Sequence, residues 1–217
     1  MTAFRNGETA AIRVALDRLT AEDSILAEAR RVAGILPERR QPATWQSLVK
    51  LIVGQQISVA AAAAIWTRML TAIEPFSAEE LMSHDDESLR GMGLSKTKVS
   101  YCRSLARAEI DGELTIDRFP DMTDEEIARQ LIAVRGIGKW TAEVFLLFAL
   151  ERPDVFPADD LALQVAVQDL YGLSERPKRP AVLEIAEQWR PDRSTAARLL
   201  WRYYGVVKQR QDPVTDG

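Results

Sequence analysis

The chain has 217 residues, of which 47% are hydrophobic and 28% are charged, and its formal net charge is -4. This is the composition of an ordinary soluble protein, long enough for one large or two small domains with a buried core. Because no global positive charge marks a nucleic-acid partner, any DNA-binding surface has to be local.

Cysteine and histidine are nearly absent, with Cys102 and His84 as the single residue of each type. This count excludes a disulfide framework, a four-thiolate zinc site and a cysteine-ligated iron-sulfur cluster. We expect Cys102 in the core of a helix and His84 in a solvated loop. The N-terminus lacks an apolar signal core, and no segment approaches about 18 uncharged apolar residues, so we expect a cytoplasmic protein.

Helical patterns cover nearly the whole chain, and no convincing series of strands interrupts them. Thr20 with Glu22-Asp23 is predicted to open the second helix, Ser95 a later one, and Thr123 with Glu126 has capping-box spacing. A loop is expected to end at 120–124. The predicted helices are 9–18, 20–34, a long region at 43–73, 77–83, 85–90, one starting near residue 95, one starting near residue 123, the segment 131–150 with a hairpin in it, 160–171, 180–189 and 192–208. The predicted fold class is all-α.

Two stretches break this pattern in an informative way. The polar GQQIS element at 54–58 interrupts the apolar region 43–73, which indicates a helix junction with a function, because buried polar groups are costly. In the second stretch, Gly136-Ile137-Gly138 opens a helix. Glycines allow a tight turn and a close approach to a ligand, and the free N–H groups of the helix start suit a phosphate. Lys139 would add charge and Thr141 a hydroxyl, although a GxG alone fits a structural turn equally well.

One helix later, the chain presents two adjacent carboxylates, Asp159 and Asp160. An isolated aspartate at this position would be interpreted as a helix N-cap. Of the two residues we expect Asp159 to be the cap, which leaves Asp160 as a candidate catalytic group.

Several blocks, in the same order, resemble the helix-hairpin-helix-GPD superfamily of DNA base-excision glycosylases, and within it the alkylbase (3-methyladenine) DNA glycosylase II branch. The resemblance covers roughly residues 44–205. It rests on LIVGQQISVAAAA, GMGLSKTKVSYCRSLA, LIAVRGIGKWTAEVF (131–145), VFPADD and RSTAARLLW.

This resemblance implies roles for particular residues. Asp160 matches the essential aspartate, and Gly136 and Gly138 match the hairpin whose amides hold the phosphate beside the lesion. Trp140 and Trp201 match positions that line the base pocket, where Val144 replaces a tyrosine of some relatives. Family members can bind a monovalent cation, Na⁺ or K⁺, on hairpin carbonyls, which align here with those of Ile132, Val134 and Gly136; no other cofactor is expected.

Further DNA contacts are expected from the GQQIS element and from basic residues. Gln55 or Gln56 matches the loop that fills the gap left by a flipped-out base, and the alternative is a polar junction that satisfies its own backbone. Lys96 and Lys98 at a helix start are interpreted as phosphate contacts, because positive charge there opposes the helix dipole. Other candidates for a local basic surface are Arg135, Lys139, Arg193 and Arg198.

The expected organisation is two helical subdomains that flank an active-site cleft. Residues 43–150 would form the central subdomain with the hairpin at 131–145, and 1–42 would pack with the C-terminal segment 151–217, which carries Asp160. Some members of this branch have an additional N-terminal β domain; because the residues before the matching region have helical patterns, we expect that domain to be absent.

The expected function is monofunctional hydrolysis of the N-glycosidic bond of alkylated bases, of the 3-methyladenine and 7-methylguanine type, in double-stranded DNA. Family members that also cut the strand have a lysine where this chain has Trp140. The protein would act as a monomer, in contact with DNA and not with a membrane. Two alternatives stay open: the same enzyme class acting on deaminated or etheno-adducted purines, and a non-catalytic DNA-binding protein.

Overall fold

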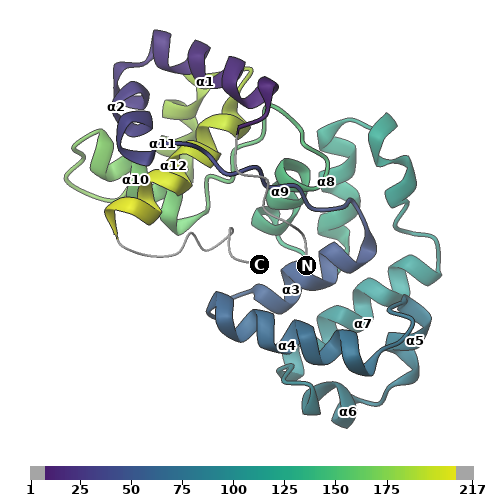
Figure 1. The fold of residues 1–217 in the computed structure, drawn as a ribbon. Helices are drawn as coiled ribbons and strands as arrows, with labels where there is room; N and C mark the ends of the chain where they lie inside the picture. Colours follow the sequence, from purple (N-terminus) through teal and green to yellow (C-terminus); the bar gives the residue numbers. More distant parts are fainter. Residues whose placement is uncertain (1–7, 209–217) are drawn as a thin grey trace. The chain divides into compact units, whose positions relative to one another are not determined.

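A computed structural model describes residues 8–208, and in this range the only regular elements are helices (Figure 1). The chain divides into two compact units, each described here by itself. One consists of residues 41–150, and the other combines residues 8–40 with 151–208. The predicted boundary at 42/43 lies two residues beyond the observed one. The predicted all-α class is confirmed.

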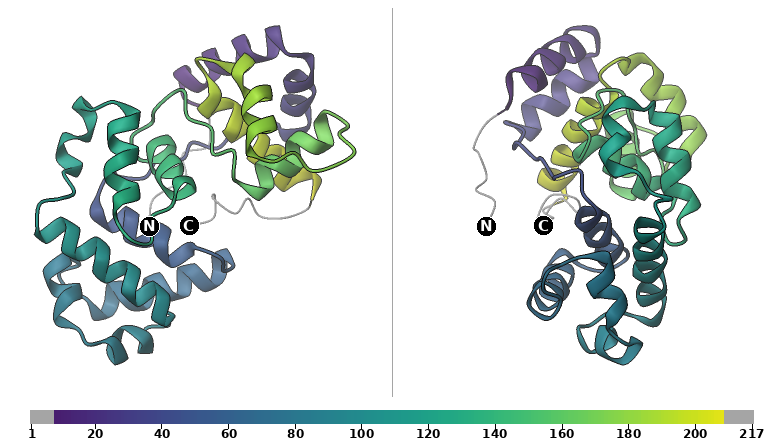
Figure 2. Two further views of the ribbon diagram at one scale, coloured as in Figure 1. Left: turned by 180° about the vertical axis from the view of Figure 1, so that it is seen from behind. Right: turned by 90° about the vertical axis from the view of Figure 1, so that its right-hand side faces the viewer.

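The unit of residues 41–150 is organised around a buried central helix. α3 (Trp45–Gly54) packs against α4 (Val59–Ala72), α7 (Lys96–Ile110) and α9 (Lys139–Phe148) (Figures 1 and 2). The short helices α5 (Ala78–Ser83) and α6 (Asp86–Gly91) pack on α7, and α8 (Asp124–Ala133) packs on α9. The apolar side chains of α3 that lie fully inside are Leu48, Val49, Ile52 and Val53.

The unit that joins the two ends of the described chain is organised around its last helix. α12 (Arg193–Val207) packs against α1 (Ala10–Glu22), α2 (Ser24–Ala33) and α10 (Leu161–Leu170) (Figure 1). α11 (Arg179–Ala186) and the 3-10 turn η2 (Glu187–Trp189) complete it. N-terminal and C-terminal parts of the sequence therefore share one core.

Local capping signals were mostly read correctly. Ser95 caps α7, and Thr123 with Glu126 forms the predicted capping box of α8. The prediction that a helix begins at Thr20 was wrong, because α1 continues to Glu22 and the Thr20 hydroxyl donates back to the Leu16 carbonyl at 2.8 Å. Asp23 is the actual cap of α2. The expected loop before Thr123 contains a 3-10 helix, η1 (Ile116–Asp121).

Cys102 lies where it was expected, whereas His84 is less exposed than expected. Cys102 is buried inside α7, and burial raises the pKa of its thiol to about 12, so the sulfur behaves as a packing group. His84 follows α5, where its Nδ1 lies 2.9 Å from the Glu80 carbonyl; it is partly buried rather than fully solvated. Among residues 8–208 there is no helix whose length and apolar character would let it cross a membrane.

Asp23 is expected to be a main stability determinant of the unit around α12. Its Oδ1 accepts the N–H groups of Ile25 and Leu26, and its Oδ2 accepts Tyr171 Oη and Trp189 Nε1, both at 3.0 Å. We expect Asp23→Ala to lower the free energy of unfolding by about 3 kcal/mol, since it removes a cap and leaves two donors without an acceptor.

Denaturant unfolding followed by circular dichroism measures this change. The control is Asp17→Ala, which removes an exposed carboxylate that pairs with Arg30, a contact worth less than about 1 kcal/mol. Equal losses in the two variants would contradict the role given to Asp23.

Candidate active site

The turn between α8 and α9 is built on a glycine that a larger residue could not replace. Gly136 has φ +99°, and a Cβ added there would lie 2.3 Å from Cγ of Tyr101. This backbone region favours glycine, and the ring of Tyr101 leaves no room for a side chain. The Ile137 N–H closes the turn on the Val134 carbonyl at 3.1 Å. Packing against α7 therefore fixes the hairpin.

The second glycine of the motif has a different role. Gly138 is the exposed N-cap of α9, its φ of -90° is accessible to any residue, and nothing lies within 4 Å of a Cβ placed there. No side chain caps α9. Amide groups at such a helix start, together with the helix dipole, suit an anion. Lys139, exposed in the first turn, adds positive charge. The geometry is compatible with the predicted binding of a phosphate by the N–H groups at the start of α9, here called the phosphate grip.

The Thr141 hydroxyl, which the sequence predicted as a phosphate contact, is engaged inside the protein. The residue is only 2% exposed, and its Oγ1 accepts a hydrogen bond from Gln55 Nε2 at 3.2 Å. The same Gln55 nitrogen lies 3.0 Å from the Gly136 carbonyl, to which it also donates. The third position of α9 faces α3 rather than solvent. Gln55 therefore ties the GQQIS element to the hairpin from inside.

Gln56 is the glutamine of this element that lies at the surface. It is exposed and has φ +58°, a left-handed conformation that few non-glycine residues adopt. Its neighbour Ile57 is 38% exposed. Two glutamines were predicted as candidates for filling a gap in a duplex. Gln55 is hydrogen-bonded inside the protein, and the side chain of Gln56 is exposed to solvent.

The two lysines predicted as phosphate contacts also differ in their surroundings. Lys96 is exposed at the start of α7. Lys98 instead donates its Nζ to the Val53 carbonyl at 2.5 Å, near the C-terminal end of α3. Burial lowers the pKa of Lys98. Positive charge at a helix C-terminus is favourable, which gives Lys98 an internal partner. A phosphate contact by Lys98 stays a prediction.

The predicted pocket residues of the hairpin helix differ in exposure. Trp140 is half-buried in the first turn of α9, whereas Val144, one turn later, is 1% exposed. A side chain that is fully packed offers no surface to a ligand in this state. A pocket role for Val144 stays a prediction.

Asp160 caps α10, and this corrects the assignment of the cap to Asp159. Its Oδ1 accepts the N–H groups of Ala162 at 2.9 Å and Leu163 at 3.1 Å. Asp159 is exposed and pairs with Arg179 at 2.7 Å. Asp160 is 7% exposed, and its place at a helix start favours negative charge there.

Trp201 completes the surroundings of this carboxylate. Its Nε1 donates to the same Oδ1 of Asp160 at 3.0 Å, and the ring is 1% exposed. The family resemblance implied that Trp201 lines the base pocket. In the structure Trp201 is a hydrogen-bond donor inside the unit. Three N–H donors therefore converge on one carboxylate oxygen.

The carbonyls expected to bind a monovalent cation are partly used by the protein. The Val134 carbonyl accepts from Ile137, and the Gly136 carbonyl accepts from Gln55. Each keeps a second lone pair, so these oxygens are compatible with a cation but do not form a dedicated cage. Within the described residues, no group of three or more His, Cys, Asp or Glu side chains could hold a metal ion.

The remaining basic candidates also divide. Arg135 is exposed in the hairpin turn. Arg193 chelates Asp154, with Nε 2.7 Å from Oδ1. Arg198 donates to the Arg39 carbonyl at 3.1 Å, and burial lowers its pKa to about 10. Arg193 and Arg198 were candidates for a local basic surface. In the structure both have partners inside the protein.

Sequence reasoning missed three contacts that build the site. They are Tyr101 against Gly136, Gln55 with Thr141 across 86 positions, and Trp201 with Asp160 across 41 positions. Each joins residues far apart in the chain, so no local pattern signals it. For Trp201 alone, the family resemblance drew attention to the residue without its partner.

An all-helical architecture with this hairpin and a buried, helix-capping aspartate defines the helix-hairpin-helix DNA glycosylase fold. Residues 49–191 match the model of the HhH-GPD superfamily of base excision DNA repair proteins, and the chain belongs to this family.

Individual relatives agree with this assignment. DNA-3-methyladenine glycosylase 1 of Schizosaccharomyces pombe is 33% identical over 76% of this chain and 73% of its own length. YfjP of Bacillus subtilis, named as a suspected DNA-3-methyladenine glycosylase, is 31% identical over 73% of this chain, which spans only 58% of it. A solved S. pombe 3-methyladenine DNA glycosylase in complex with abasic DNA superposes with a TM-score of 0.80 and 30% identity, covering 90% of this chain and 97% of that one.

Replacing either hairpin glycine by alanine is expected to have a different effect: Gly136→Ala should affect stability, and Gly138→Ala should affect DNA binding. Gly136→Ala should lower the free energy of unfolding by about 2 kcal/mol or more, because of backbone strain and the clash with Tyr101. Gly138→Ala should cost less than about 1 kcal/mol, yet weaken DNA binding by about tenfold, because its Cβ would lie where a phosphate approaches. Thermal melting and fluorescence anisotropy with a DNA duplex measure the two effects. Unchanged binding by a folded Gly138→Ala would contradict the phosphate grip.

Proposed function

We propose that this protein is a monofunctional DNA glycosylase that hydrolyses the N-glycosidic bond of alkylated bases, of the 3-methyladenine and 7-methylguanine type, in double-stranded DNA. The observation that carries the proposal is the buried Asp160 carboxylate, held by three N–H donors, in a chain whose named relatives are DNA-3-methyladenine glycosylases. The abasic site that remains would pass to the later steps of base excision repair.

Asp160 supplies the negative charge that this reaction requires. As the base departs, positive charge builds on the deoxyribose, and a fixed carboxylate near C1′ stabilises that oxocarbenium-like state. The same carboxylate can orient an attacking water or accept its proton. Because Oδ1 is held by Ala162, Leu163 and Trp201, the group does not have to reorganise when the charge develops.

Water is proposed as the nucleophile because the hairpin helix lacks the required amine. In relatives that also cut the strand, a lysine at the position of Trp140 forms a Schiff base with the sugar. Here the nearest amine, Lys139, lies one position earlier and is rotated by about 100° around the helix. The expected product is therefore an intact strand with an abasic site.

Stacking on indole is proposed as the basis of lesion choice. Alkylated purines carry positive charge, so an aromatic face adds a cation–π attraction on the order of 1 kcal/mol. Trp140, half-buried at the start of α9, is the first candidate. Trp201 and Val144 are both fully packed here, so a pocket role for them would require a change in their packing. The proposal thus assigns the base to the hairpin helix and the sugar chemistry to Asp160.

Contacts with the rest of the duplex are assigned to surface groups. The N–H groups at the start of α9, beginning with Gly138, would bind a phosphate together with Lys139, and Lys96 would bind another. Gln56 would fill the gap left by the flipped base and hydrogen-bond the orphaned partner. A Na⁺ or K⁺ ion on the carbonyls of Ile132, Val134 and Gly136 would add positive charge beside the phosphate. The protein is proposed to act as a monomer, on chromosomal DNA in the cytoplasm.

Removing only the charge of Asp160 is expected to abolish base release while the fold survives. In Asp160→Asn the amide oxygen still caps α10, so the variant should melt close to wild type. Release should fall by at least about 100-fold, because the charge that stabilises the transition state is gone. The assay is single-turnover release from duplexes that carry one 7-methylguanine, 3-methyladenine, hypoxanthine or ethenoadenine.

The matched control is Asp159→Asn, which changes a neighbouring carboxylate that pairs with Arg179. It should retain release within about threefold, since an exposed ion pair contributes little. If Asp160→Asn releases bases as wild type does, Asp160 is only a helix cap and its catalytic role is refuted; if the wild type releases no base, the glycosylase assignment fails. Preferential release of hypoxanthine or ethenoadenine would keep the enzyme class and change the substrate.

Borohydride is expected to trap no covalent complex between this protein and lesion-bearing DNA. Trapping needs an imine formed by an amine of the protein, and the position that supplies it in strand-cutting relatives is Trp140 here. Electrophoresis of the reduced reaction under denaturing conditions detects an adduct. A Trp140→Lys variant tests the geometry directly, and an adduct formed by the wild type would contradict the monofunctional mechanism.

A further inference from the structure

Asp160 is delivered by a segment without regular secondary structure, residues 151–159, here called the strap. Its last part is fixed by the bonds of Asp160 to α10 and Trp201. A chain of this length without helix or strand needs a second attachment to hold a side chain to a fraction of an ångström. Near its end, the strap is also bound by Gln164, which donates to the Ala158 carbonyl, and by Arg179, which pairs with Asp159. Its beginning is bound by the first turn of α12.

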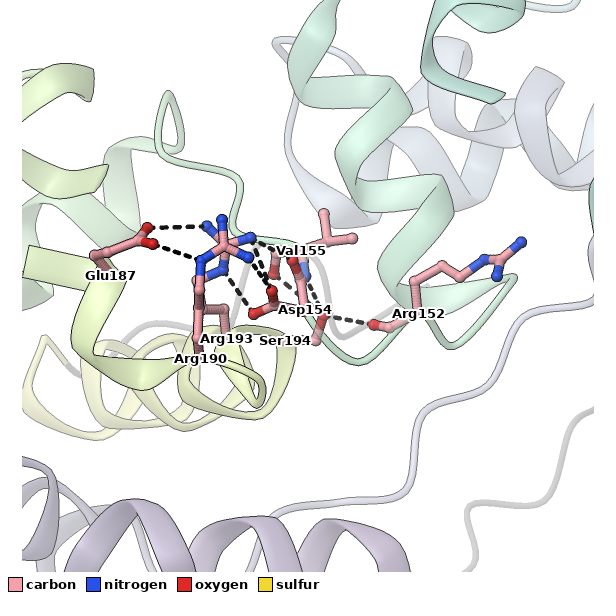
Figure 3. A network of polar contacts seen from close by, with 7 residues as sticks. All are labelled: Arg152, Asp154, Val155, Glu187, Arg190, Arg193 and Ser194. Carbon is pink, nitrogen blue, oxygen red and sulfur yellow. Dashed lines mark hydrogen bonds and ion pairs between the residues drawn. The ribbon is translucent and has the colours of Figure 1, made fainter. Parts of the chain in front are cut away.

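Ser194, in the first turn of α12, binds the beginning of the strap at several points. Its Oγ donates to the Arg152 carbonyl at 2.6 Å and accepts the N–H of Val155 at 2.9 Å (Figure 3). The Ser194 N–H donates to the Pro153 carbonyl at 3.0 Å. The side chain is buried, so these partners have no water to replace it.

Arg193 holds the intervening residue of the strap. Its Nε lies 2.7 Å from Asp154 Oδ1, and its Nη2 lies 2.8 Å from the Asp154 carbonyl (Figure 3). Arg190 binds the same carboxylate from the other side, and Glu187 accepts from Arg190 at 2.7 Å. Side chain and backbone of Asp154 are both fixed.

The N-cap of α12 lacks its usual side-chain hydrogen bond, which leaves a first-turn N–H available to the strap. A helix N-cap residue ordinarily accepts a first-turn N–H with its own side chain. Here the N-cap Asp192 makes no such bond, because its carboxylate binds Arg18 at 2.5 and 2.7 Å. The Pro153 carbonyl takes over as acceptor for the N–H of Ser194. The strap thus replaces the missing cap.

Both ends of the strap are attached to one face of α12. Ser194 and Trp201 are seven residues apart, which is about two turns, or roughly 10 Å, along the same side of a helix. Ser194 binds residues 152–155, and Trp201 binds Asp160. The helix sets the separation of the two attachment points.

We propose that Arg193 and Ser194 are positioning residues for the reaction, which set the orientation of the Asp160 carboxylate by fixing the strap to α12. This inference rests on the glycosylase function proposed above. Neither residue is required to touch the substrate. Their loss should impair the chemical step and leave DNA affinity unchanged.

The test compares Ser194→Ala with Tyr203→Phe, which removes another hydroxyl of α12, one that donates to Asp169 at 3.0 Å and does not touch the strap. Ser194→Ala should slow single-turnover base release at saturating enzyme by about tenfold or more, because small displacements of a reacting group are costly. Its Kd for a duplex with an abasic site should stay within about twofold of wild type, and Tyr203→Phe should change neither quantity.

A second readout does not depend on activity. The indole N–H resonance of Trp201, assigned by Trp201→Phe, reports its hydrogen bond to Asp160 and should shift in Ser194→Ala but not in Tyr203→Phe. If Ser194→Ala does not fold, Arg193→Lys replaces it, with Arg31→Lys in the exposed pair with Glu28 as control. Lysine keeps the charge but loses the forked contact with Asp154.

A slower chemical step together with a shifted indole resonance supports the inference. A release rate equal to that of the control variant, or an unmoved resonance, overturns it. If the wild type releases no base from any lesion duplex, the proposed function fails instead, and the resonance alone decides whether Ser194 positions Asp160.

Discussion

The functional reading of this fold depends on one carboxylate oxygen that accepts three N–H groups. Ala162 and Leu163 come from the helix that Asp160 caps, and Trp201 comes from a helix 41 positions later. A single residue therefore starts α10, links it to α12 and keeps a negative charge in a buried place. Helix capping and catalysis are usually treated as competing explanations for an aspartate. Here the cap is what gives the carboxylate a fixed direction.

The hairpin unit uses the same principle with different groups. Its hairpin turn is held by Tyr101 against Gly136 and by Gln55, whose amide reaches both the Gly136 carbonyl and Thr141. Lys98 binds the Val53 carbonyl just before the GQQIS element. The groups proposed to contact DNA, namely Gly138, Lys139 and Gln56, are exposed. Support and contact are thus divided between neighbouring residues.

The sequence predicted what depends on near neighbours and missed what depends on distant ones. The all-α fold, the Ser95 cap and the capping box at Thr123 follow from short spacings. The choice between Asp159 and Asp160 as cap does not, because Trp201 and Arg179 decide it through contacts that close only in the folded chain. Likewise, whether Thr141 or Lys98 faces solvent depends on how α3 packs. Family resemblance drew attention to Asp160 and Trp201 without showing that they contact each other.

The left-handed backbone of Gln56 has an energetic consequence for the proposed DNA recognition. A non-glycine residue at φ +58° costs on the order of 1 kcal/mol, and the folded protein carries that cost before any DNA is bound. If Gln56 enters a duplex as proposed, a loop that is already bent need not lose conformational entropy there, so more of the binding free energy would be available to open the base pair. The same bend would make glycine or asparagine at position 56 a stabilising change for the free protein. Selection for stability and selection for repair would then favour different residues at this one position.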